Sequence, residues 1–143
     1  MTRMTKEYKI LLNYVKDLSV ETPDVETLLN VRNSIPHYTV SVNIESKPLK
    51  NKMIEVSTKL TYTDPRENQK KAFFEIIYAT VIKIENQNIN KEMLQKIILC
   101  DLQIEIYPEL EKIFLTILRN SGYPELQFGK KIDFQELYNK RLS

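Results

Sequence analysis

The stretch YTVSVNIESKPLKNKMIEVSTKLTY, residues 38–62, decides the fold of this chain. Apolar and polar side chains alternate strictly near both of its ends, which is the period of a half-buried β-strand. The apolar positions of the two runs are Tyr38, Val40, Val42 and Ile44, then Ile54, Val56, Leu60 and Tyr62. Lys47-Pro48 and Asn51, between the runs, are typical of a turn. The stretch therefore predicts two half-buried strands separated by a turn.

Two more strands are expected, one on each side of this stretch. Residues 8–14 alternate with period 2, and an irregular segment, residues 24–35, follows between Pro23 and Pro36. Residues 72–84 are apolar on both faces of the strand that they predict. One face carries Phe74, Ile76, Tyr78, Ile82 and Ile84, and the other carries Phe73, Ile77, Ala79 and Val81. Apolar area on an outward face usually marks a subunit or partner interface, so we expect an oligomer.

The last third of the chain predicts helices. Asn90 is a suitable N-cap for a helix over residues 91–102, and Pro108 fits the first turn of a second helix that ends at Gly122. Asp133 and Glu136 form a capping-box-like pair before a short last helix. Strands followed by helices favour an α+β fold. We therefore predict one domain, residues 1–143, with a four-stranded antiparallel sheet and C-terminal helices packed on one face.

Composition excludes several classes of function. With 21 Lys and Arg against 19 Asp and Glu, the net charge is +2, which gives no argument for nucleic acid or a membrane surface. The single Cys100 and single His37 make a metal site, a disulfide framework or a His-based triad improbable, and the two glycines, Gly122 and Gly129, cannot form a phosphate-binding loop. We expect no cofactor and no enzymatic activity. The start MTRMTKEYK has no apolar core, so a cytoplasmic location is expected.

At this point the sequence resembles a known family. The run YVKDLSVETP, residues 14–23, resembles the signature Y-x-K-D-[IL]-S-x-E-x-P of SecB, the bacterial protein-export chaperone. Further similar segments follow in family order: FFEIIYA at residues 73–79, YP at 107–108, GYPEL at 122–126 and IDFQELY at 132–138. The departures are Thr80, where the family usually has Gly, and Leu102-Gln103, where it usually has Cys-Pro. An ending in Lys140-Arg141-Leu142-Ser143 replaces the acidic tail of many members. The chain resembles a divergent member.

The resemblance implies an ATP-independent chaperone that holds non-native polypeptides for Sec-dependent export and hands them to the SecA motor ATPase. It also implies a homotetramer, a dimer of dimers. The residues carried over to SecA binding are Asp17, Glu21, Phe73 and Glu75. The aromatic residues proposed to line grooves for unfolded clients are Tyr38, Tyr62, Phe74, Tyr78 and Tyr107. The strand of residues 72–84 and the helix of residues 91–102 are expected to be buried in the tetramer.

Other interpretations stay open at this stage. The carboxylates are also compatible with a solvated surface, and each aromatic residue with ordinary core packing. A SecB-like chaperone dedicated to one client, such as the antitoxin of a toxin–antitoxin system, is one alternative function. A structural assembly subunit without client binding is another.

Overall fold

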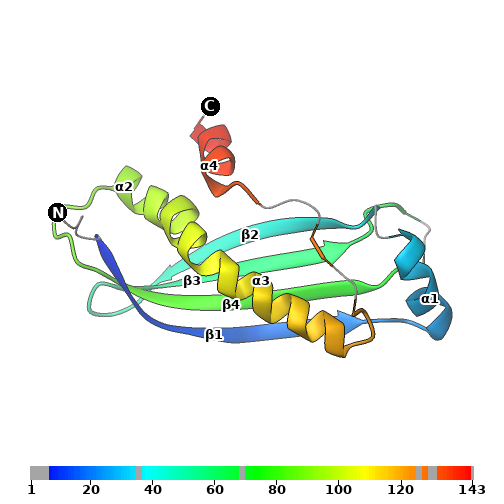
Figure 1. The fold of residues 1–143 in the computed structure, drawn as a ribbon. Coiled ribbons are helices and arrows are strands. Elements are labelled where there is room, and N and C mark those ends of the chain that lie inside the picture. Colours follow the sequence, from blue (N-terminus) through cyan, green and yellow to red (C-terminus); the bar gives the residue numbers. More distant parts are fainter. Residues whose placement is uncertain (1–6, 35–36, 68–69, 125–126, 129–131, 143) are drawn as a thin grey trace, which may run out of the picture.

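Four strands form one antiparallel sheet in the spatial order β1-β4-β3-β2 (Figure 1). They are β1 (Tyr8–Glu21), β2 (Thr39–Pro48), β3 (Met53–Thr63) and β4 (Phe73–Ile84). The structure is a computed structural model that describes residues 7–34, 37–67, 70–124, 127–128 and 132–142. The number of strands and their antiparallel pairing confirm the four-stranded antiparallel sheet predicted from the sequence.

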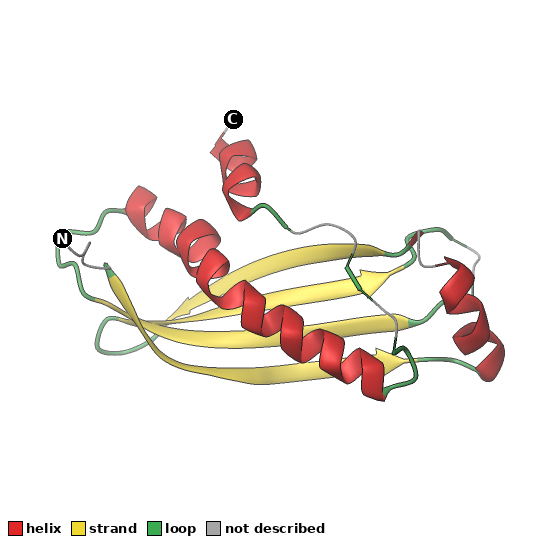
Figure 2. Cartoon of the chain, in the orientation of Figure 1, coloured by secondary structure: helices red, strands yellow, loops and turns green. Residues whose placement is uncertain are grey.

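The helices lie on one face and at one end of this sheet (Figure 2). The short helix α1 (Val25–Ser34) lies at the end of the sheet where β1 finishes, and α4 (Phe134–Leu142) stands above the sheet. Between them, α2 (Lys91–Lys96), the π-helical turn η2 (Ile97–Asp101) and α3 (Leu102–Asn120) run on as one rod, which crosses the sheet diagonally. No helix of the described residues covers the opposite face, which we call the outer face.

The core lies between the sheet and α3. Burial along β3 alternates strictly, with every second side chain from Ile54 to Tyr62 buried, as its sequence pattern predicts. From α3, four apolar residues are completely buried against this face: Leu102, Leu110, Phe114 and Leu118. The i, i+4 spacing of these residues gives α3 one apolar side. The helix is thereby fixed on the sheet by burial of apolar surface.

Strand β1 contains two register shifts that its sequence pattern does not predict. The register against β4 shifts between Ile10 and Leu12 and again between Val15 and Asp17. Each shift is an extra, unpaired residue of the kind found in β-bulges. Ile10 pairs with Ile82 on the helix side, whereas Leu12 pairs with Val81 on the outer side. The period-2 pattern placed these residues on one face, and that expectation is wrong because the bulge reverses the alternation.

Two helix predictions also need correction. Residues 24–35 were expected to be irregular, but α1 occupies most of them. The side chain of Asp24 caps the start of this helix, because it accepts hydrogen bonds from the Thr27 backbone N–H and from the Thr27 hydroxyl, at 2.7 Å each. The predicted break before Pro108 does not occur, because Pro108 lies inside the continuous α3. Proline removes the bond to the carbonyl four residues earlier, that of Ile104. Ile104 is on the exposed side of the helix.

Three predicted helix ends are confirmed. Asn90 caps α2 through a hydrogen bond from the Met93 N–H at 2.8 Å. After α3, Gly122 has a φ of +105° and the next N–H, that of Tyr123, bonds back to the Leu118 carbonyl at 3.0 Å. Asp133 accepts from the Glu136 N–H at 3.0 Å at the start of α4. Local capping chemistry thus fixes the helix ends.

The π-helical turn η2 is tied to the sheet by one buried side chain. The Leu102 N–H bonds to the Ile97 carbonyl, five residues back. Gln103, which is completely buried, donates from Nε2 to the Ile98 carbonyl at 3.1 Å and accepts the Thr58 hydroxyl at 3.1 Å. A buried amide with both ends bonded stabilises this turn, since unpaired polar groups are costly in a core.

Candidate functional site

The outer face of the sheet brings together the four residues predicted to bind SecA. Asp17 lies opposite Ile77, Glu21 opposite Phe73, and Glu75 opposite Ser19 between the neighbouring strands β1 and β4. Directly opposed side chains on one face of an antiparallel pair lie about 5 Å apart at Cβ. We call Asp17, Glu21 and Glu75 the acidic patch. Their proximity follows from the register, whereas their partner remains a prediction.

The surroundings of the acidic patch are polar. Glu75, half-buried, accepts a hydrogen bond from the Thr61 hydroxyl at 3.1 Å. Lys16 is bound elsewhere, at 2.7 Å to Glu55, which also accepts the Tyr14 hydroxyl at 2.6 Å. The ion pair with Lys16 lowers the pKa of Glu55. In the strand pairing, Lys59 of β3 lies opposite Ile77 of β4, which in turn lies opposite Asp17 of β1.

Three of the five predicted client-binding aromatics form one buried cluster. Tyr38, Tyr62 and Phe74 expose at most 7% of their surface. The ring of Tyr62 lies 5.4 Å from that of Tyr38 and 6.1 Å from that of Phe74. Burial raises the pKa of Tyr62 to about 12. In the single subunit these rings pack the core and line neither of the grooves described below, and their role in client binding stays a prediction.

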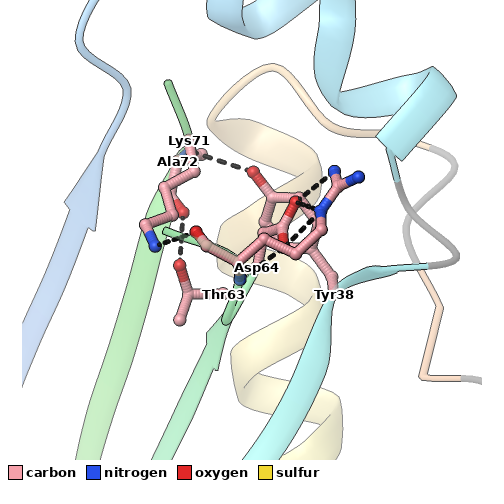
Figure 3. A network of polar contacts seen from close by, with 6 residues as sticks. Tyr38, Thr63, Asp64, Lys71 and Ala72 are labelled. Carbon is pink, nitrogen blue, oxygen red and sulfur yellow. Dashed lines mark hydrogen bonds and ion pairs between the residues drawn. The ribbon is translucent and has the colours of Figure 1, made fainter. Parts of the chain in front are cut away.

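A polar network links the end of β3 to the start of β4 beside this cluster (Figure 3). The Tyr38 hydroxyl accepts the Ala72 N–H at 2.9 Å, and Thr63 donates to the Ala72 carbonyl. Asp64 is almost fully buried and forms an ion pair with the Arg66 guanidinium, whose Nη2 donates a hydrogen bond to Asp64 Oδ2 at 2.6 Å. Hydrogen bonding from Arg66 lowers the pKa of Asp64 to about 2. This network holds the start of β4 against the cluster.

Tyr78 and Tyr107 lie in different surroundings. Tyr78 is buried on the helix side of β4. The buried hydroxyl of Tyr107 makes no hydrogen bond of ordinary geometry within the described residues. Burial raises the pKa of Tyr107 well above its usual value, and the nearby Glu111 carboxylate adds to the shift. Of the five aromatics, Tyr107 is the one that lines either of the two grooves described next.

Two apolar grooves meet at Phe134. The first, which we call the α3 groove, has a volume of about 350 Å³. Residues of α3 line it together with Ile132 and Phe134, which lie just before and at the start of α4. Its lining is Ile104, Tyr107, Pro108, Glu111, Lys112, Leu115, Ile132 and Phe134. The second, the α4 groove, has a volume of about 280 Å³ between β2, η2 and α4. Its lining is Val42, Ile44, Leu99, Phe134, Leu137, Tyr138, Lys140 and Arg141.

The sequence indicated only part of these grooves. Ile104, 55% exposed, and Leu137, 46% exposed, are large apolar residues on them that were not singled out. The signal in α4 was the apolar spacing of Phe134, Leu137 and Tyr138, which alone predicts a helix face and not a cavity. Val42 and Ile44 belong to a strand whose apolar side extends beyond the cover of α3, and this could be seen only in the folded chain.

A further apolar surface lies on the edge strand β1. Five large side chains on it are exposed by 39–50%: Leu11, Leu12, Tyr14, Val15 and Leu18. The sequence placed the outward apolar area on β4 instead. There Ala79 and Val81 are already buried within the subunit, and Phe73 and Ile77 are half-buried. The exposed apolar surface is therefore on the neighbouring strand.

Neither a metal-binding cluster nor a membrane-spanning helix is found in the described part of the chain. Within it, no group of three or more His, Cys, Asp or Glu residues is placed to hold a metal ion. Nor does any helix in these described ranges have the length and apolar character needed to cross a membrane.

Comparison with known proteins gives consistent results. The family model described as "Preprotein translocase subunit SecB" matches residues 2–143. A protein of Pelagibacter ubique that carries a provisional assignment as protein-export protein SecB is 49% identical over 138 residues, covering 96% of this chain and 99% of its own. The protein-export protein SecB of Xanthobacter autotrophicus is 29% identical over 133 residues, covering 93% of this chain and 83% of its own.

A solved structure has the same fold at low sequence identity. It is the SecB-like chaperone Rv1957 of Mycobacterium tuberculosis, in complex with a ChAD peptide from the HigA1 antitoxin. The TM-score is 0.60 at 10% identity, over 87% of this chain and 91% of that one. At this identity the similarity concerns the fold alone.

Proposed function

The chain belongs to the SecB family, and on that premise we propose that it is an ATP-independent chaperone that holds non-native polypeptides for export. The observation that carries the proposal is the family match over residues 2–143. We also propose that residues 1–143 act as one SecB-like domain in the cytoplasm, without cofactor and without catalysis. Binding an unfolded chain and not its folded form opposes folding by mass action, so no bond needs to be made or broken.

The two grooves support client holding. Their lining is mainly apolar, with a few polar groups, and apolar burial has no directional requirement. A surface of this kind accepts many unrelated sequences, which a general chaperone needs. Both grooves have Phe134 in their lining, and we propose that one extended client segment occupies both.

Substituting the exposed groove residues Ile104 and Leu137 by Ser is expected to lower client holding several-fold. Both side chains lie on groove surface, so the fold should tolerate the change. The measurement is suppression of aggregation of several unrelated unfolded proteins. A matched control is the pair Val25→Ser and Leu29→Ser on α1, which are 65% and 67% exposed and line neither groove.

The outcome also separates the alternative functions. A general chaperone slows the aggregation of several clients, a dedicated one protects a single protein, and a structural subunit protects none. If the groove variant with its oligomer intact holds clients as well as the control, the grooves are not the binding surface.

We propose a homotetramer, a dimer of dimers, as the working form. The edge strand β1 supports this, because its outer edge has no strand neighbour in the described chain and its apolar side chains are exposed. An unprotected edge of 14 residues readily pairs with another chain.

We propose the acidic patch as the contact for the cationic C-terminal segment of the SecA motor. Clustered carboxylates on a flat surface steer and orient a cationic partner. Because the patch is on the outer face and the grooves are on the helix side, both partners have room on one subunit.

Charge reversal in the acidic patch, Asp17→Lys with Glu21→Lys, is expected to weaken binding of this SecA peptide about tenfold or more at low salt. Added salt should weaken binding to the unchanged protein, since exposed charges are screened over about 8–10 Å in physiological buffers. Client holding should not change. The control is Glu85→Lys with Glu92→Lys, which reverses the charge of two exposed carboxylates outside the acidic patch. Glu85 directly follows β4, and Glu92 is on α2. Absence of any binding by the intact tetramer at low salt would exclude delivery to SecA and favour a dedicated chaperone.

A further inference from the structure

The α4 groove combines an apolar lining with charge of one sign. Both charged residues that line it within the described chain, Lys140 and Arg141, are cationic. Lys140 also lies 3.4 Å from Glu136, but both side chains are more than 60% exposed. Such exposed pairs contribute little to stability, so the pair with Glu136 does not exclude a ligand carboxylate from the groove. The groove is therefore complementary to anionic groups beside an apolar segment.

The strand that lines this groove favours an extended ligand. Val42 and Ile44 are two residues apart and lie on the same face of β2. β2 is an edge strand, with β3 as its neighbour on one side alone in the described residues. An extended peptide can align with such an edge, with alternate side chains directed toward the same surface. The groove is then filled by every second side chain of the ligand.

The neighbouring surfaces carry different charge. The α3 groove is lined by one residue of each sign, Glu111 and Lys112, so it offers no preference. The acidic patch on the outer face repels anionic segments. Of these three surfaces of the described chain, the α4 groove is the one that favours a carboxylate-bearing segment.

We propose that the α4 groove selects extended client segments in which apolar residues are flanked by Asp or Glu. This selectivity rests on the proposed function as a client-holding chaperone and names the class of client segment preferred. Apolar burial provides most of the affinity, and the pair Lys140 and Arg141 ranks otherwise similar segments.

The test uses three labelled peptides with one apolar core and flanks of Glu, Lys or Ser, measured by fluorescence anisotropy on the full chain. The Glu-flanked peptide is expected to bind about three- to tenfold more tightly than the Ser-flanked one at low salt, as exposed ion pairs allow. The difference should shrink as salt is added. In the variant Lys140→Gln with Arg141→Gln the preference should vanish, while the Ser-flanked peptide keeps its affinity.

Two controls make the outcomes decisive. Lys50→Gln with Lys91→Gln removes the same charge at exposed positions outside both grooves, and it should leave the preference intact. Equal binding of all three peptides, or loss of the preference in both double variants, overturns the proposed selectivity but leaves client holding in place. Failure of every peptide to bind, together with no protection of unfolded proteins, overturns the proposed function itself.

Discussion

Replacing Phe74 by Ala is expected to lower the free energy of unfolding by about 3–5 kcal/mol. Phe74 is completely buried, and its ring lies 5.0 Å from that of Tyr123 and 6.1 Å from that of Tyr62. The substitution leaves a cavity under α3, where the surrounding rings can collapse only in part. Urea unfolding followed by circular dichroism at fixed protein concentration measures the change, since an oligomer's apparent stability depends on concentration.

The control for Phe74 is Leu137→Ala, an apolar truncation at a residue that is 46% exposed. It should cost below about 1 kcal/mol, because little area is removed from a buried site. A cost for Phe74→Ala as small as that of Leu137→Ala, accompanied by weaker client binding, would mean that Phe74 belongs to a client surface and not to the core.

If the proposed dimer forms through β1, replacing Leu12 by Lys is expected to raise its dissociation constant by about a hundredfold or more. Leu12 is 50% exposed in the subunit, so the fold has room for the longer side chain. Two copies of the new charge would be buried at a symmetric contact, and unpaired buried charge is costly. Charged residues on edge strands are a known means of preventing edge-to-edge association. Sedimentation or light scattering at several concentrations measures the shift.

The matched control for Leu12 is Leu49→Lys in the turn between β2 and β3, where the side chain is 37% exposed. It should leave the oligomer unchanged. A wild-type chain near 17 kDa at micromolar concentration, or a Leu12→Lys variant that assembles as before, would exclude β1 as the interface.

The sequence predicted the sheet well because period-2 burial is a local property. In β3 and β4 the alternating residues have the predicted faces. In β1 the bulges reverse the faces between Ile10 and Leu12, and a pattern of apolar residues does not mark an unpaired residue. The continuous α3 was missed since Pro108 suits a first turn and is also tolerated within a helix when tertiary packing compensates.

The sequence indicated the residues of the proposed acidic patch but not how the fold arranges them. The signature names Asp17 and Glu21, but their position beside Glu75 and Phe73 depends on β1 pairing with β4 across some 60 residues of chain. The apolar character of Tyr38, Tyr62 and Phe74 was evident, yet the same pattern is typical of a core and of a groove. The groove residues Ile104 and Leu137 became visible only through their exposure.

The π-helical turn η2 has a consequence for how this sequence can evolve in length. Its extra residue changes the rotational phase between α2 and α3 by about 100°, the angle of one helical residue. Deleting a residue from Ile97–Asp101 would turn the buried pair Ile97 and Ile98 away from the sheet and separate Gln103 from its carbonyl partner. Insertions and deletions should therefore be rare between Asn90 and Gln103.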